Sequence, residues 1–181
     1  MAVSSLMVPL GTPAPEFALP DATGTVVRRD DLAAAPALLV AFLCNHCPYV
    51  RHIEAEFGKV LAGFPDLAVV GINTNDADAY PEDSPEHMAE QAARAGWTFP
   101  YLVDGDQRVG RAFNAACTPD FFLYDADRRL AYRGAFDEST PRNGATLDGH
   151  LLRGAIERVL AGEPVPEPHR ASMGCSIKWR D

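Results

Sequence analysis

The stretch PALLVAFLCNHCP, residues 36–48, joins an apolar run to two cysteines and a proline. The nearly continuous apolar run 36–43 predicts a strand buried on both faces, as strands of parallel sheets are. Beyond Pro48, apolar residues recur mostly at spacings of three and four, which predicts an amphipathic helix. Its apolar positions are Val50, Ile53, Phe57, Val60, Leu61 and Phe64. We therefore expect the two cysteines where a buried strand gives way to a helix.

That position favours ionised sulfur. We expect Cys44 at or just before the helix N-terminus and Cys47 one turn further in, where unpaired N–H groups and the helix dipole favour negative charge. A thiolate in such a motif has its pKa lowered to roughly 3.5–7.5. His46, when protonated, would add further stabilisation. Because the thiolate is the nucleophile of disulfide exchange, we expect Cys44 to attack and Cys47 then to resolve the mixed disulfide. Pro48 is tolerated because the first turn of a helix does not need every N–H.

Two other interpretations of the cysteine pair stay open. One is a buried structural pair of thiols. The other is a zinc site, which would need two more ligands with a spacing of their own. The remaining candidates are Cys117, Cys175, His52, His150 and His169, but the chain has no second CxxC and no HxxxH. We predict neither a metal nor a cofactor.

Composition limits the classes of partner. The chain has 181 residues, 47% of them hydrophobic, and a net charge of −9, which suits one soluble domain over residues 1–181. No run of Lys or Arg is present to neutralise phosphates, so we expect neither nucleic acid nor an anionic membrane surface as partner. The N-terminus has no basic region and no window approaches the roughly 20 apolar residues of a membrane span. These features favour a cytoplasmic location, where a close cysteine pair indicates redox chemistry or metal binding.

Strand and helix patterns alternate along the rest of the chain. Strands are predicted at 25–29, 67–74, 99–104, 120–125 and 129–136, the last two as a hairpin. Helices are predicted at 83–96, 106–115 and 147–162. The Pro-rich tail 163–181 should be extended and docked on the domain, with Ile177 and Trp179 as anchors. The pattern predicts an α/β sandwich with a mixed sheet.

Four segments resemble the AhpC/TSA (peroxiredoxin-like) side of the thioredoxin-like superfamily. They are GTPAPEFALPDATG (11–24), CNHCPYV (44–50), CTPDFFLYD (117–125) and GCSIKW (174–179). The resemblance implies a three-layer sandwich, with a central mixed sheet of about five strands flanked by helices, an N-terminal extension and an extended C-terminal tail. It also implies that the Thr118–Pro119 peptide is cis and faces the cysteines. The backbone held there is where a substrate strand can pair.

The resemblance leads to two enzymatic branches. Peroxiredoxins carry P-x-x-x-T-x-x-C at this turn, with an Arg from a later strand; here Cys47 falls at the peroxidatic position, but Cys44 replaces the Thr and Val40 the Pro. We therefore favour a thiol–disulfide oxidoreductase with a redox-active disulfide. Thioredoxins, however, carry a buried Asp where this chain has Leu38. The predicted catalytic residues are Cys44 and Cys47, with His46, Pro48, Thr118 and Pro119 in support.

The alternatives are a thiol-dependent peroxidase (an antioxidant), with Cys47 attacking and Cys44 resolving, and a redox-inert binding module. The expected partners are a protein or low-molecular-weight disulfide, or a peroxide, and a reductant thiol system.

Two further cysteines and one polar turn are weaker candidates. Cys117 is either a third thiol beside the pair or a small buried residue. Cys175 is buried, paired with Cys117, or a resolving thiol. Asn73, Asn75 and Asp76 follow a predicted strand, on the edge where active sites of open α/β sheets gather.

Overall fold

Six buried residues form the middle strand of the molecule. The computed structural model describes residues 2–180, and within it β4 (Ala37–Phe42) has no exposed side chain. This strand is the apolar run singled out in the sequence. It pairs in parallel with β5 (Leu67–Asn73) on one side and antiparallel with β8 (Asp120–Tyr124) on the other.

The central sheet is mixed and has five strands in the order β6-β5-β4-β8-β9. The outer strands are β6 (Tyr101–Val103) and β9 (Leu130–Gly134), and β8 and β9 form the predicted hairpin. The helices are α1 (Pro48–Ala62), α2 (Pro85–Ala95), α3 (Arg108–Ala112) and α4 (His150–Leu160), with 3-10 turns at Arg29–Leu32 and Pro81–Asp83. The predicted α/β class with a five-stranded mixed sheet is confirmed.

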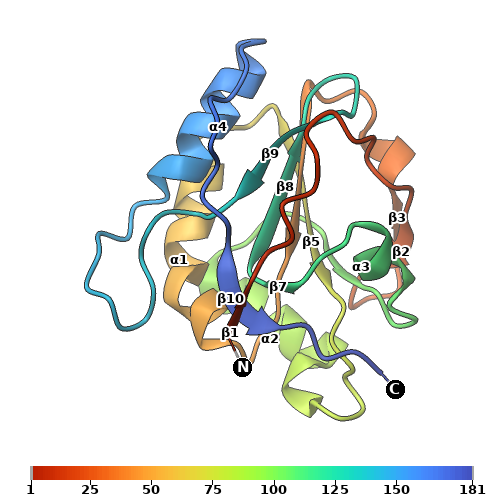
Figure 1. The fold of residues 1–181 in the computed structure, drawn as a ribbon. Coiled ribbons are helices and arrows are strands. Elements are labelled where there is room, and N and C mark those ends of the chain that lie inside the picture. Colours follow the sequence, from red (N-terminus) through yellow and green to blue (C-terminus); the bar gives the residue numbers. More distant parts are fainter. Residues whose placement is uncertain (1, 181) are drawn as a thin grey trace.

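Alternate residues of β4 face two separate apolar clusters. Leu39 and Ala41 belong to the cluster formed with α1, α2 and α4, whereas Leu38 and Val40 belong to the cluster formed with α3 and the N-terminal segment. Figure 1 shows α1 and α4 on one side of the sheet and α3, with the hairpin of β2 (Ala18–Pro20) and β3 (Val26–Arg28), on the other. Helical and sheet layers thus form a three-layer sandwich.

The two ends of the chain meet in a second, three-stranded sheet. β10 (Met173–Ser176) lies between β1 (Ala2–Ser4) and the short β7 (Cys117–Thr118), antiparallel to both. In Figure 1 the red first strand and the blue last strand lie side by side. The C-terminal tail therefore contributes a strand beside the segment that precedes Pro119.

The sequence patterns missed β1, β2, β7 and β10. Each has two to four residues, too few for an alternation of apolar and polar positions to be visible. The helix predicted at 106–115 is shorter than expected, because Gln107 and Asn114 on either side of it have left-handed backbone (φ 61° and 54°). The tail is extended, but part of it is a paired strand. None of the helices in residues 2–180 is long and apolar enough to cross a membrane.

Candidate active site

The cysteine pair lies in the turn that follows β4. Cys47 is the N-cap residue of α1, and Pro48 is its first helical residue. Cys44 therefore lies outside the helix, three residues before the N-cap. The helix therefore begins later than expected: Cys44 was predicted at or just before its N-terminus and Cys47 one turn inside, but Cys47 is the residue at the N-terminus. The reason is Pro48: it lacks an N–H and is best tolerated at the first helical position, so the helix begins there. Both cysteines are fully buried.

A hydrogen-bonded chain links the two sulfurs to Thr118. The Thr118 hydroxyl lies 3.1 Å from Cys44 Sγ, and the Thr118 carbonyl lies 3.2 Å from Cys47 Sγ. Hydrogen bonding to Cys47, together with burial and the charge of Asp83, raises the pKa of Cys44 well above its ordinary value. Cys44 is therefore the protonated member of the pair.

Cys47 is the ionised member because the groups around its sulfur favour the negative charge. The Cys44 thiol is the largest cause; the Cys175 thiol and the N–H groups of Val50 and Cys175 add to it, and together they lower the pKa of Cys47 to about 5 although burial opposes them. In its protonated form Cys47 donates instead to the Thr118 carbonyl, 3.2 Å away. Above pH 5 this arrangement holds a thiolate in a place shielded from water.

The Thr118–Pro119 peptide is cis, as the resemblance implied. It lies directly against both sulfurs, since Thr118 contacts Cys44 through its hydroxyl and Cys47 through its carbonyl. The predicted positions Cys44, Cys47, Thr118 and Pro119 are therefore brought together by the fold.

His46 points to a carboxylate that the sequence analysis did not single out. Its Nδ1 lies 2.5 Å from Asp83 Oδ2, and its ring stacks on Tyr80 at 5.3 Å. The hydrogen bond to Asp83 is the largest cause of a raised His46 pKa, and the charge of Cys47 adds to it, against burial. Burial raises the pKa of Asp83, but hydrogen bonds from His46 and Asn75 outweigh it, and the net pKa lies below the ordinary value.

Asp83 also fixes the backbone of the cysteine turn. Its Oδ1 accepts from the N–H of Asn45 (2.7 Å) and from the N–H of His46 (3.2 Å). The pattern DSPEHM predicted a helix start at residue 83, but the N-cap of α2 is Ser84, and the Asp83 side chain is buried under the turn. An acid next to a helix start is read as a cap, so no local signal marked this role.

The polar turn after β5 holds Asp83 in place. Asn75 Nδ2 donates to Asp83 Oδ2 (2.8 Å), and Asn73 Nδ2 donates to the Asp83 carbonyl (3.0 Å). Asp76 instead pairs with Arg180 of the tail at 2.9 Å. The first two residues therefore support the cysteine turn, and the third anchors the C-terminus.

The helices beside the turn supply three more positioning contacts that the sequence analysis missed. Gln91 of α2 is fully buried and its Nε2 donates to the Cys44 carbonyl at 3.1 Å. Arg51 Nε donates to the Asn45 carbonyl (2.8 Å), and Arg94 Nη2 donates to Asn45 Oδ1 (3.0 Å). Gln91 lies three residues after Met88 and four before Ala95, at the spacing of the buried face of α2. A polar residue at such a position was the one signal in the sequence for these contacts.

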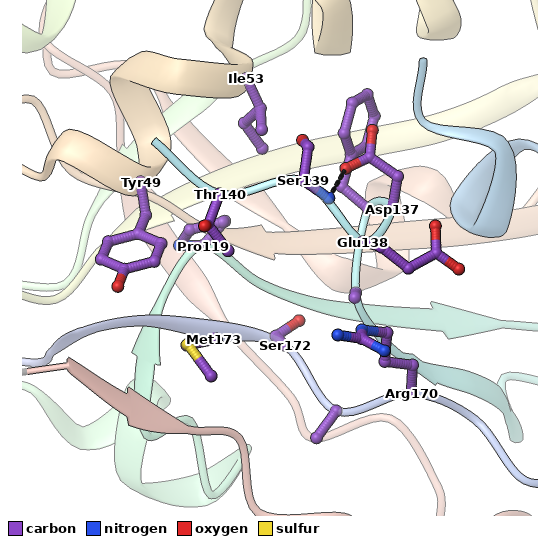
Figure 2. Close-up of a pocket in the computed structure, with 13 residues that line it drawn as sticks. Tyr49, Ile53, Pro119, Asp137, Glu138, Ser139, Thr140, Arg170, Ser172 and Met173 are labelled. Atoms are coloured by element: carbon purple, nitrogen blue, oxygen red, sulfur yellow. Dashed lines mark hydrogen bonds between the residues drawn. The ribbon is translucent and has the colours of Figure 1, made fainter. Parts of the chain in front are cut away.

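A pocket opens on the α1 side of Pro119 (Figure 2). Tyr49 and Ile53 of α1 line it, with Pro119, the loop 135–140 and residues 170–173. In Figure 2 Tyr49, Thr140 and Met173 stand around Pro119, and Asp137 accepts a hydrogen bond from the Ser139 N–H at 2.8 Å. Within residues 2–180 none of the cysteines lines this pocket. Its wall includes Pro119, which directly follows the Thr118 that contacts both sulfurs.

Cys117 and the remaining histidines stand apart. Cys117 Sγ donates to the Pro119 carbonyl at 3.5 Å, and burial raises its pKa, so it is a protonated thiol. His169 is buried, and its Nδ1 lies 2.9 Å from Arg133 Nη1. His150 pairs with Asp148.

One group within residues 2–180 has ligand atoms in metal-binding reach. Cys44, His46 and Asp83 present a sulfur, a nitrogen and an oxygen within 4.8 Å of one another. His46 Nδ1 and Asp83 Oδ2 already form an ion pair with each other. The histidines considered as zinc ligands in the sequence, His52, His150 and His169, are not part of this group.

Comparison with known proteins agrees with this geometry. Residues 10–133 match the model of the AhpC/TSA family, and the chain belongs to that family, on the thioredoxin-like fold. A hypothetical protein from Sinorhizobium meliloti is 45% identical, with a TM-score of 0.96 over 98% of each chain. An uncharacterized conserved protein from Geobacillus kaustophilus is 46% identical, with a TM-score of 0.96 over 99% of this chain and 97% of that one.

A more distant neighbour shares the fold. The secreted disulfide oxidoreductase of Mycobacterium tuberculosis has a TM-score of 0.61 at 19% identity, over 78% of this chain and 94% of that one. Comparison with curated proteins gave no significant match. Family membership and the thiol cluster together support a thiol redox function.

Proposed function

We propose that this protein is a dithiol–disulfide oxidoreductase that uses Cys47 as nucleophile and Cys44 as resolving thiol. The observation that carries the proposal is that Cys47 at the α1 N-cap and Cys44 in the preceding turn both lie within hydrogen-bonding distance of Thr118. The lowered pKa of Cys47 and the raised pKa of Cys44 support it. The thiolate is the species that attacks a disulfide, and its partner must hold a proton until it is needed.

The reaction proceeds in two exchanges. The Cys47 thiolate attacks one sulfur of a substrate disulfide; a Cys47–substrate disulfide forms, and the other substrate sulfur leaves as a thiolate and takes a proton. Cys44 then loses its proton and attacks Cys47 Sγ, which releases the second substrate thiol and leaves a Cys44–Cys47 disulfide. Two electrons pass from the protein to the substrate, and a reductant thiol system returns them.

The surroundings assist the second exchange. Cys44 has a raised pKa largely because it hydrogen-bonds to ionised Cys47, and that charge disappears once Cys47 is in a mixed disulfide. The Thr118 hydroxyl then remains to stabilise a Cys44 thiolate, since its hydrogen bond lowers the pKa of that thiol. Cys44 thus becomes a better nucleophile when it must attack.

A peroxidase is the second candidate, because the N-cap thiolate stands at the peroxidatic position. Against it, among the hydrogen bonds of residues 2–180 none joins an arginine to Cys47; Arg51 donates to the Asn45 carbonyl instead. A peroxide would lack the cation that helps polarise its O–O bond.

A paired assay tests the proposal. The purified protein is incubated with insulin and dithiothreitol, and separately with hydrogen peroxide and a thioredoxin system. Insulin reduction without peroxide turnover supports the oxidoreductase, the reverse supports the peroxidase, and failure of both refutes a redox role. In addition, Cys44→Ser/Cys175→Ser, which has no second thiol beside Cys47 to resolve the intermediate, should accumulate a mixed disulfide between Cys47 and a substrate thiol, and Cys47→Ser should accumulate none.

A further inference from the structure

The C-terminal strand occupies the backbone edge beside the cysteine pair. In β10, Cys175 is opposite Thr118 and Ser176 is opposite Cys117. An extended chain that adds to a strand edge is held by backbone hydrogen bonds, and its side chains are then set against fixed neighbours. Here the added chain is the protein's own, and the side chain it sets beside the active sulfurs is a thiol.

The approach of β10 to this edge is unusually close at Gly174. A Cβ on Gly174 would lie 1.9 Å from the Thr118 carbonyl oxygen and 3.1 Å from the Pro119 nitrogen. No side chain fits there without moving backbone, so glycine is required for β10 to lie against the Thr118–Pro119 peptide. The same contact determines where the next residue, Cys175, is positioned.

Cys175 lies beside the cysteine turn: it is opposite Thr118 in β10, and the Thr118 carbonyl accepts from the Cys47 thiol at 3.2 Å. The thiol and the backbone N–H of Cys175 are among the groups that lower the pKa of Cys47. It packs against the apolar cluster that contains Cys44 and Cys47, yet it is the one cysteine of the four that is partly exposed. Among the four cysteines, Cys175 is therefore the one positioned to exchange disulfides between the buried pair and the surface.

The strand is anchored on both sides. β1 pairs with its other edge, with Ala2 opposite Cys175. Beyond β10 the Ile177 N–H donates to the Ala116 carbonyl (3.2 Å), and the Lys178 N–H donates to Asn75 Oδ1 (2.8 Å). Trp179 lies under the Arg111 guanidinium at 4.5 Å. These contacts hold β10, and with it Cys175, against the Thr118–Pro119 peptide.

We propose that Cys175 is a third redox thiol, which attacks the Cys44–Cys47 disulfide at Cys47 and carries oxidation to the surface as a Cys47–Cys175 disulfide. This inference rests on the proposed function, which supplies the Cys44–Cys47 disulfide. The Cys175 thiolate forms a bond to Cys47 Sγ, the Cys44–Cys47 bond breaks, and Cys44 leaves as a thiolate and takes the proton that Cys175 lost. No electrons enter or leave the protein, and the reverse exchange restores the original disulfide.

The change in charge at Cys47 favours this direction of attack. In the dithiol form, burial and then the hydrogen bond and charge of Cys47 raise the pKa of Cys175 to about 12. When Cys47 is in a disulfide, its hydrogen bond and charge no longer oppose ionisation. Cys175 therefore becomes easier to ionise in the state in which it must attack.

Disulfide mapping of trapped variants tests the inference. Reduced Cys44→Ser protein is treated with diamide, free thiols are alkylated, and the peptides are analysed by mass spectrometry. We expect a Cys47–Cys175 link in most molecules, and the same link in Cys44→Ser/Cys117→Ser, which controls for the buried Cys117. A link to Cys117, intermolecular links alone, or no link at all would overturn the inference.

Gly174→Ala provides a second test that keeps all four cysteines. The added methyl group collides with the Thr118 carbonyl and displaces β10, so in Cys44→Ser/Gly174→Ala the Cys47–Cys175 link should fall about tenfold or more. Gly105→Ala, where a Cβ meets no atom within 4 Å, is the matched control and should leave the link unchanged. Circular dichroism spectra of all variants establish that they are folded.

Kinetics separate this inference from the proposed function. In Cys175→Ser the Cys44–Cys47 disulfide should still form, while insulin reduction slows about tenfold. If the wild type reduces insulin through Cys44 and Cys47 and Cys175→Ser is equally fast, the relay is refuted and the proposed function stands. If the wild type forms no Cys44–Cys47 disulfide and reduces no insulin, the proposed function fails first.

Discussion

Cys47 lies against the short segment Cys117–Pro119, and Cys117 is part of it, yet the pKa values of the two thiols are shifted in opposite directions. The Cys44 and Cys175 thiols and the N–H groups of Val50 and Cys175 favour the ionised form of the Cys47 sulfur, and its pKa falls to about 5. The Cys117 sulfur has a carbonyl oxygen as its neighbour, with the buried Asp120 nearby, and its pKa rises. Burial raises the pKa of both, so the donors and not the depth decide which sulfur is reactive.

The largest expected effect is on activity. Cys47→Ser should lower insulin reduction about a thousandfold or more, because it removes the nucleophile, whereas Cys117→Ser should stay within about twofold of wild type. The measurement is the initial rate of insulin precipitation at equal protein concentration. Comparable losses in the two variants would erase the contrast between the two regions.

The next effect is a loss of stability when the Asp83 carboxylate, which holds the cysteine turn, is removed. Asp83→Ala leaves the N–H groups of Asn45 and His46 and the Asn75 amide without their acceptor, so the free energy of unfolding should fall by about 2–4 kcal/mol.

Urea unfolding of the reduced protein measures this loss, with Asp78→Ala as the control, because Asp78 is an exposed carboxylate that pairs with Arg180 at the surface. The pKa of His46, followed by NMR, should also drop in Asp83→Ala. Equal urea midpoints for the two variants would refute the role given to Asp83.

A smaller effect is expected on the titration of Cys47. The thiolate absorbance that is present in wild type and absent in Cys47→Ser should appear with a midpoint near pH 5. Cys44→Ala removes the largest cause of the lowered pKa and should raise the midpoint by about one unit. A midpoint that stays at pH 5 would mean that the backbone donors suffice.

The same lowered pKa predicts how stability depends on pH. Because the folded pKa of Cys47 lies below the unfolded value of about 8.5, the unfolded chain holds the proton between these two values while the folded protein has lost it. The stability of reduced wild type relative to Cys47→Ser should therefore rise as the pH increases from 5 to about 8.5, and this gain is lost as the pH falls towards 5. Urea unfolding at several pH values measures it; a flat difference would contradict the thiolate assignment.

The smallest effect is expected at the end of the tail. Arg180 pairs with the carboxylates of Asp76 and Asp78 at an exposed site, and exposed ion pairs contribute little to stability. Arg180→Ala should leave both the urea midpoint and the Cys47 titration unchanged within error. A shift in the titration would show that the end of the tail, and not β10 alone, maintains the Cys47 region.

Much of this molecule was predictable from local patterns. The run 36–43 predicted a buried strand, and the spacing after Pro48 predicted the helix, because side-chain periodicity is a property of neighbouring residues. The Thr118–Pro119 segment was identified by its resemblance to a family. Asp83 was not found, because an acid before a helix is normally a cap, and the side chain that it meets belongs to a turn formed far away in the sequence.

The sequence by itself determined that a cysteine pair follows a buried strand at the start of a helix. Which sulfur is ionised was decided only by the tertiary structure. The donors that lower the pKa of Cys47 include Cys175, and the hydroxyl that contacts Cys44 belongs to Thr118; both are brought to the turn by β7 and β10. A thiol's pKa depends on the groups within hydrogen-bonding distance, and folding alone determines which distant residues those are.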